Sequence, residues 1–199
     1  NKRGQKRAIH HSSSTVFLAA LNLDQGIDTE ISLLNHFLLK REILDVIAYV
    51  ELFDVPGNKV GSFEVKMAEP RSYAFRLSEH MTDNFLGSLY IFFKSSHNLA
   101  VPFCAVMSSI KAAKSVCGVH TYGRRLEENE LGTGIELSET VETGWTLRDS
   151  ASIKSFAVLH GGAFEVSLDI RVECANHLGE IRAVNLSKAL KPYGTLLLF

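Results

Sequence analysis

Eight histidines are the residues of this sequence with the most versatile chemistry. They are His10, His11, His36, His80, His97, His120, His160 and His177. No two of them show the H-x-H or H-x-x-x-H spacing that places two imidazoles on one metal ion from a single strand or helix. Distant histidines can still meet in a fold, but the sequence itself predicts neither a metal site nor a cofactor.

One of these histidines lies in a stretch that could bind a ligand. In "VHTYGRR" the side chains of His120, Tyr122 and Arg124 alternate with other residues, so an extended strand places them on one face. Such a set could hold a carboxylate, a sugar hydroxyl or a phosphate. The alternative is a strand end whose amphipathic side chains lie at its solvated rim.

The only tryptophan, Trp145, has a cationic neighbour, Arg148, in "GWTLRD". An exposed indole can stack on the C–H groups of a sugar while neighbouring side chains take its hydroxyls. The alternative is that Trp145 closes one end of the core. We predict a ligand-binding set of His120, Tyr122, Arg124, Trp145 and Arg148, and no catalytic residues.

Sequence motifs for other chemistry are absent. The sequence has no G-x-S-x-G nucleophile motif and no phosphate-binding G-x-x-x-x-G-K-[ST] or G-x-G-x-x-G loop. The cupin motif needs two histidines one residue apart and then a glutamate. The corresponding stretch offers His120, Tyr122 and Glu127, so the second histidine is missing and no family is assigned.

Charge and cysteine content narrow the classes of partner. The formal net charge is −1, which gives no long-range attraction to nucleic acid, and no apolar run is long enough to span a bilayer. The three cysteines, Cys104, Cys117 and Cys174, form no C-x-x-C pair, and their odd number leaves at least one free thiol. We expect no nucleic-acid or membrane partner, and a reducing, cytoplasmic compartment.

The elements that position these residues follow from a two-residue hydrophobic period. From Phe164 to Cys174 apolar and polar residues alternate, which predicts a strand with one buried face. The "ANHLG" turn follows, and Ile181 and Ala183 are expected to resume the inward parity in a hairpin. Residues 45–67 predict a second hairpin, with Pro56 and Gly57 in its turn.

Other segments also favour strands, namely 15–21, 72–77, 87–93, 101–110, 115–122 and 152–160. Residues 31–44 fit either a helical stripe or two short strands, and strands are preferred given their surroundings. We therefore predict an all-β protein, a mainly antiparallel sandwich, with an internal duplication into two related halves as a further hypothesis. The expected division is a flexible basic segment 1–14, a β half 15–122, an acidic loop or linker 123–144, and a second β half 145–199 packing on the first.

The apolar end "TLLLF" (195–199) should be covered inside a sheet or by another subunit, because an exposed strand edge of this kind aggregates. A homo-oligomer through this strand is one expectation. Among functions, we favour a non-catalytic module that binds a small molecule or a carbohydrate. The alternative is an enzyme or a metal-binding, cupin-like β-barrel whose site assembles from distant His and Glu residues.

Overall fold

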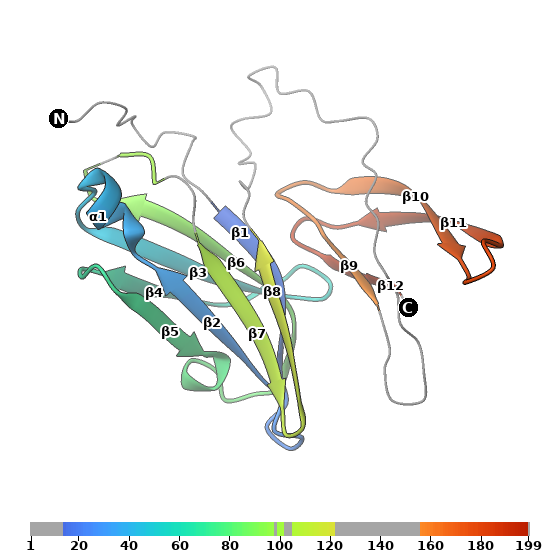
Figure 1. Cartoon of the computed structure of the whole chain (residues 1–199), viewed down its shortest axis with the longest axis horizontal. Coiled ribbons are helices and arrows are strands. Elements are labelled where there is room, and N and C mark those ends of the chain that lie inside the picture. The colour runs from blue at the N-terminus through green and yellow to red at the C-terminus, as the bar shows by residue number, and fades with distance from the viewer. Residues whose placement is uncertain (1–13, 98, 102–104, 122–155, 199) are drawn as a thin grey trace.

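Two four-stranded antiparallel sheets form the larger part of the protein in a computed structural model, which describes residues 14–97, 99–101, 105–121 and 156–198 (Figure 1). Their strand orders are β1-β6-β3-β4 and β5-β2-β7-β8. In chain order the elements are β1 (Ser14–Leu21), β2 (Asp28–Leu34), α1 (His36–Arg41), β3 (Val46–Asp54), β4 (Lys59–Met67), β5 (Ser72–Arg76), the 3₁₀ turn η1 (Leu77–Glu79), β6 (Phe85–Ser95), β7 (Val106–Ala112) and β8 (Ser115–Thr121).

One apolar core lies between the two sheets, because each strand turns its alternate side chains inward. Buried side chains come from both sheets and from α1, and include Phe17, Ile31, Leu33, Phe37, Val50, Leu52, Phe75, Leu89, Ile91, Phe93 and Val106. The prediction of an all-β, antiparallel sandwich is confirmed.

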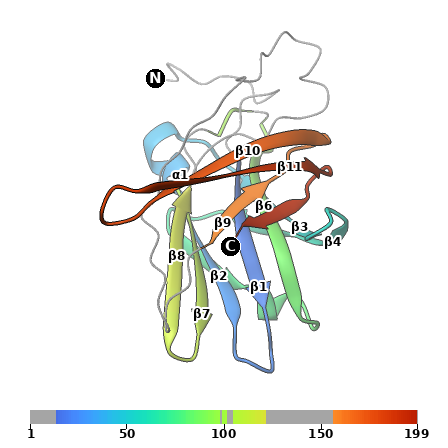
Figure 2. The ribbon, with the colours of Figure 1, turned by 90° about the vertical axis from the view of Figure 1, so that its right-hand side faces the viewer.

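The C-terminal strands form two further antiparallel pairs, β12-β9 and β10-β11. Their bounds are β9 (Ala157–His160), β10 (Val166–Ala175), β11 (Ile181–Leu190) and β12 (Thr195–Leu198). Figures 1 and 2 show these pairs beside the two four-stranded sheets, with the long β10–β11 hairpin lying outermost. The predicted apolar strand at 195–198 is thus paired within the chain, with Leu196 opposite Leu159.

Residues 31–44 differ from the two short strands that the sequence favours. β2 ends at Leu34, and α1 begins at His36. Between them the buried Asn35 donates from Nδ2 to the carbonyls of Met67 (2.8 Å) and Glu69 (3.0 Å). This anchor turns the chain out of the sheet, and the short helix that follows buries only Phe37.

The register of the C-terminal hairpin also corrects the expectation for its second strand. Val172 lies opposite Val184, whereas Ile181 lies opposite Ala175 and Ala183 opposite Glu173. Ile181 and Ala183 therefore lie on the polar face of the hairpin, and Ile181 is 65% exposed. The turn accommodates Gly179 at a φ of 79°, and this turn sets the register one residue away from the one expected.

The remaining expectations about organisation stay predictions. These are the internal duplication and the division at residues 14, 122 and 144, of which segment 1–13 and loop 123–144 lie outside the described residues. Within the described residues, no helix has the length and apolar character needed to cross a membrane.

Candidate functional site

Of the predicted binding set, only His120 lies in a described strand. Its backbone pairs with Met107 across the β7–β8 ladder, and nothing is described of its side chain. Tyr122, Arg124, Trp145 and Arg148 lie outside the described residues. The grouping of these five residues therefore stays a prediction, and the candidate site is built from other side chains.

The outer side of the sheet that contains β3, β4 and β6 carries an aromatic pair next to charged side chains. Tyr49 of β3 lies opposite Phe92 of β6 in the ladder, and both are partly exposed. Their rings stack with centroids 5.3 Å apart and planes 11° apart. We call this surface the β3–β6 face, defined by Tyr49, Glu51, Lys59, Ser62, Glu64, Phe92 and Lys94.

Strand alternation explains why these rings point away from the core. Their neighbours Val50, Ile91 and Phe93 occupy the inward parity and are buried, so Tyr49 and Phe92 take the outward parity. Adjacent strands then bring the two outward aromatics side by side, at a cross-strand position where such pairs stabilise a sheet.

A cation lies over this pair. The Nζ of Lys94 is 5.2 Å from the centroid of each ring. An ammonium over aromatic faces is attracted by their quadrupoles, and the attraction orients the lysine side chain on an exposed surface. The β3–β6 face therefore presents an ordered positive charge at one side of the aromatic pair.

Polar groups lie on the other side of Tyr49, toward β4. Glu64 is opposite Tyr49, and Ser62 is opposite Glu51. Lys59 Nζ lies 2.9 Å from Glu51 Oε1, and the Glu51 side chain is 18% exposed. These side chains surround a shallow depression of about 230 Å³, lined by Tyr49, Val50, Glu51, Lys59, Ser62, Phe63, Glu64 and Phe92.

This arrangement places an aromatic pair beside charged and polar side chains. The Tyr49 ring stacks on Phe92, and both rings line the depression. A carboxylate, an ammonium and a hydroxyl border the same space. Within the described residues there is no cluster of three metal-ligating side chains.

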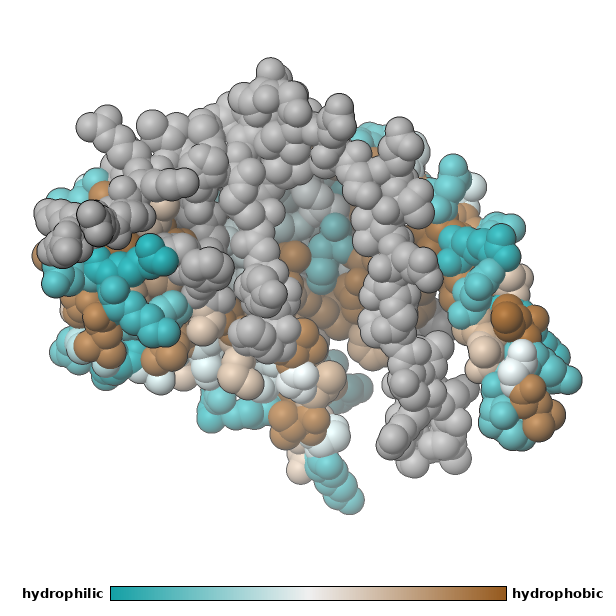
Figure 3. Space-filling model, turned by 45° about the horizontal axis from the view of Figure 1, so that its top comes forward, coloured by the Kyte–Doolittle hydropathy of each residue, from teal (hydrophilic) through white to brown (hydrophobic). Residues whose placement is uncertain are grey.

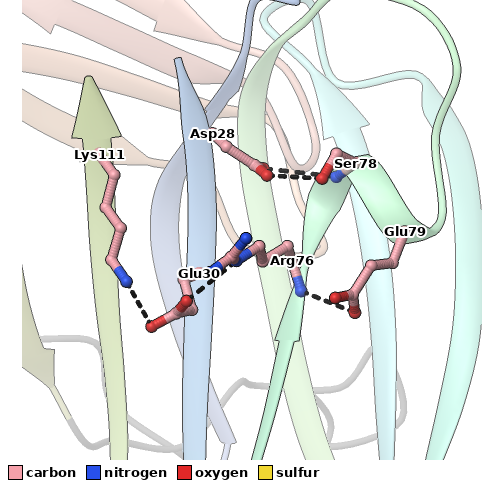
Figure 4. Close-up of polar contacts among 6 residues, drawn as sticks. All are labelled: Asp28, Glu30, Arg76, Ser78, Glu79 and Lys111. Atoms are coloured by element: carbon pink, nitrogen blue, oxygen red, sulfur yellow. Dashed lines mark hydrogen bonds and ion pairs between the residues drawn. The ribbon is translucent and has the colours of Figure 1, made fainter. Parts of the chain in front are cut away.

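A second polar cluster lies on the outer side of the other sheet (Figure 4). Glu30 of β2 accepts bonds from Lys111 Nζ of β7 (2.7 Å) and Arg76 Nε of β5 (3.1 Å). The bonds from Lys111 and Arg76 hold the pKa of the Glu30 carboxyl below its usual value. Glu30 is thus an ionised link between three strands, and its two oxygens already have cationic partners.

Neighbouring groups of this second cluster are also paired. Asp28 accepts from the hydroxyl of Ser78 (2.6 Å) and from its backbone N–H (3.3 Å), and Glu79 accepts from the backbone N–H of Arg76 (3.1 Å). These bonds attach η1 to β2 and β5, as Figure 4 shows. We assign the cluster a structural role.

A third group of side chains joins the C-terminal strands to the sandwich. The Tyr90 hydroxyl donates to the Gly161 carbonyl, and the backbone N–H of Thr195 donates to the Val55 carbonyl (3.0 Å). Next to this contact, burial lowers the pKa of His160 to about 4, and its Nδ1 lies 3.2 Å from Thr195 Oγ1. We call this contact between the C-terminal strands and the sandwich the joint, and the mostly buried, neutral His160 is part of it.

The aromatic pair of the β3–β6 face was missed by sequence reasoning. Residues 87–93 are apolar on both parities, which predicts a strand that is covered on both sides. Tyr90 is buried, as this predicts, but Phe92 is partly exposed. The usable signal was an aromatic residue on the outward parity in each of two strands. Sequence could not show that β3 and β6, which are not consecutive, are neighbours.

Comparison with models of protein families, with curated proteins and with solved structures finds no match for this chain.

Proposed function

We propose that this protein is a non-catalytic binding module that takes a carbohydrate on the β3–β6 face. The observation that carries the proposal is the Tyr49–Phe92 ring pair at the border of a depression that also contains Glu51, Lys59 and Ser62. Sugars present apolar C–H patches beside hydroxyl groups, so they bind where an aromatic face and short polar groups converge.

The charges of the face support a neutral ligand. Lys59, Lys66 and Lys94 project from the same side of the sheet as Glu51 and Glu64, so neither sign dominates. The whole chain has a formal charge of −1. A polyanion such as nucleic acid would need a strongly basic surface, which the described part of the chain does not offer here.

The test is a screen of purified protein against an array of neutral glycans, followed by calorimetric titration of the best ligand. Tyr49→Ala should weaken binding about 5- to 150-fold, if sugar stacking on the ring contributes on the order of 1–3 kcal/mol, the range for stacking of a planar base. Tyr73→Ala is the matched control, because Tyr73 also lies under a cation, Arg71, but on β5 of the other sheet.

A second matched pair tests the role of the lysine. Lys94→Ala should weaken binding, whereas Lys114→Ala, in the exposed turn between β7 and β8, should not. Thermal melts would verify that each variant is folded. Absence of binding to every glycan, or binding unaffected by Tyr49→Ala, would reject the proposal.

A further inference from the structure

Among the described elements, β10 is an edge strand of the β10–β11 hairpin. β10 pairs along its whole length with β11, and within the described residues no strand pairs with its other edge. Its ten residues are extended and alternate between a half-buried apolar set, Val166, Leu168, Ile170 and Val172, and an exposed polar set, Ser167, Asp169, Arg171 and Glu173. Two strands alone make a sheet of marginal stability, and an open edge is a template for another strand.

The charges on β10 are self-complementary in one antiparallel register. With Ile170 on a two-fold axis, Asp169 of each copy lies opposite Arg171 of the other. The polar side then contains two opposite-charge pairs. On the apolar side Leu168 lies opposite Val172, and Val166 opposite Cys174.

Other registers of β10 against itself are worse. An axis at Asp169 brings two carboxylates together, and an axis at Arg171 brings two guanidinium groups together. Axes at Leu168 or Val172 allow ion pairs but leave several residues at one end of β10 without a partner. An axis at Ile170 is the one that combines opposite charges with overlap of the full strand.

The other edge of the hairpin lacks this property. β11 carries Arg182 and Lys188 and has no carboxylate between Ile181 and Leu190. Two copies of β11 would therefore gain no ion pair. Arg171 lies 2.5 Å from Glu173 with both side chains at least half exposed, so this ion pair is weak. Asp169 accepts a hydrogen bond from the hydroxyl of Ser187 on β11 (2.7 Å), and its other oxygen is available to a cation.

We propose that two copies of this chain associate by antiparallel pairing of β10 with β10, across a two-fold axis at Ile170. The product is a four-stranded sheet in the order β11-β10-β10-β11, with one continuous apolar face. Figure 2 shows the hairpin on the outside of the described part of the molecule, and Figure 3 shows hydrophobic and hydrophilic residues side by side at that end.

Charge complementation between two variants tests the register. In homodimers of Asp169→Lys the introduced ammonium would oppose Arg171, and in homodimers of Arg171→Glu the introduced carboxylate would oppose Asp169, so each variant should raise the dissociation constant at least tenfold. In a heterodimer of the two variants both cross-strand pairs again join opposite charges. The ammonium introduced on one chain lies opposite the carboxylate introduced on the other, and the native Arg171 lies opposite the native Asp169. A heterodimer should therefore form with near wild-type affinity. Analytical ultracentrifugation measures all three samples, with circular dichroism as the check on folding.

Three results of the ultracentrifugation experiment would overturn the proposed dimer. A wild-type protein that is monomeric at about 100 μM overturns the proposal, as do single variants that dimerise like the wild type. A mixture that associates no better than its components also overturns it, because a purely structural role of Asp169 and Arg171 within one chain predicts that result.

A disulfide cross-link provides an independent measurement. Ile170→Cys, made with Cys104, Cys117 and Cys174 replaced by serine, places two thiols on the axis, where opposite Cα atoms of an antiparallel pair are about 5 Å apart and within disulfide reach. Leu186→Cys is the matched control, since it lies opposite Ile170 on β11 and one strand further from the axis on each side. Oxidation should link Ile170→Cys chains and leave Leu186→Cys chains single; the reverse or equal linkage overturns the register.

Discussion

The ring of Phe53, near the end of β3, stacks on the ring of Tyr193, in the turn before β12, with centroids 4.3 Å apart and planes 18° apart. Tyr90 of β6 meets both rings edge-on, with centroids 5.5 Å from each. Three aromatic side chains from distant parts of the sequence thus form the contact between the sandwich and the C-terminal strands.

Removing the stacked ring should weaken this joint. We expect Phe53→Ala, at a 4% exposed position, to lower the free energy of unfolding by about 3 kcal/mol. A double-mutant cycle of Phe53→Leu and Tyr193→Leu should show a coupling of about 1 kcal/mol in urea denaturation. Additive effects of the two substitutions would show that the stacking geometry contributes nothing beyond burial.

Gly57 is a second determinant of the same joint. It has a φ of 100°, and a Cβ there would overlap the Pro192 carbonyl oxygen. Gly57→Ala should therefore both strain the β3–β4 turn and displace the turn before β12. We expect a loss of at least about 2 kcal/mol and faster proteolysis of the C-terminal segment.

Gly26→Ala is the control for this effect. Gly26 also has a positive φ, 63°, but no atom lies within 4 Å of the position that a Cβ would occupy. This substitution should cost only the backbone strain, about 1 kcal/mol. Equal losses for the two variants would show that the contact between Gly57 and Pro192 has no energetic weight.

The two-residue period was enough to predict most strands and both hairpins, because burial of one strand face is a local property of the sequence. It failed where a distant contact decided the structure. The helix after β2 depends on Asn35, whose amide is held by the carbonyls of Met67 and Glu69, and no pattern within residues 31–44 reveals those partners.

The candidate site was less predictable than the fold. Tyr49 and Phe92 become neighbours only because β3 lies beside β6, a pairing between strands that are not consecutive. The Glu51–Lys59 pair was easier to predict from the sequence, since both residues flank the turn of one predicted hairpin. Residue types alone directed attention to Trp145 and Arg148, which lie outside the described residues.

The Glu30 cluster predicts a dependence of stability on acid. Glu30→Gln should lower the free energy of unfolding by about 1 kcal/mol at pH 7, because Lys111 and Arg76 lose an ionised partner. The pKa of Glu30 is lowered from 4.5 in the folded state, so its contribution is present above that value and is lost as the pH falls further. The difference in free energy of unfolding between wild type and variant should therefore be smaller at about pH 3 than at about pH 7 in urea denaturation.

A glutamate away from these cations is the control for that titration. Glu165→Gln, at an exposed position before β10, should change stability by less than about 0.5 kcal/mol at either pH. A loss of unfolding free energy on Glu30→Gln that is the same at about pH 3 and at about pH 7 would contradict the assignment of Glu30 as an ionised link.

His160 predicts an acid effect in a different pH range. Burial lowers its pKa from 6.5 to about 4, so the imidazole is neutral at pH 7 in both the folded and the unfolded chain. Between these values the unfolded chain takes up a proton that the folded chain does not, and stability therefore falls as the pH decreases from about 6.5 to 4, by at most about 3 kcal/mol.

Replacing this imidazole isolates its contribution. His160→Asn keeps a polar group beside Thr195 and removes the titration, so the variant should lose less stability than the wild type between about pH 7 and pH 4.5. His97→Asn, at an exposed histidine after β6, should follow the wild-type profile. Because the neutral His160 lies in the joint, the acid-induced loss should appear first as proteolytic release of the C-terminal strands, before the sandwich unfolds. Parallel pH profiles for His160→Asn and the wild type would instead show that this imidazole is free to protonate in the folded protein.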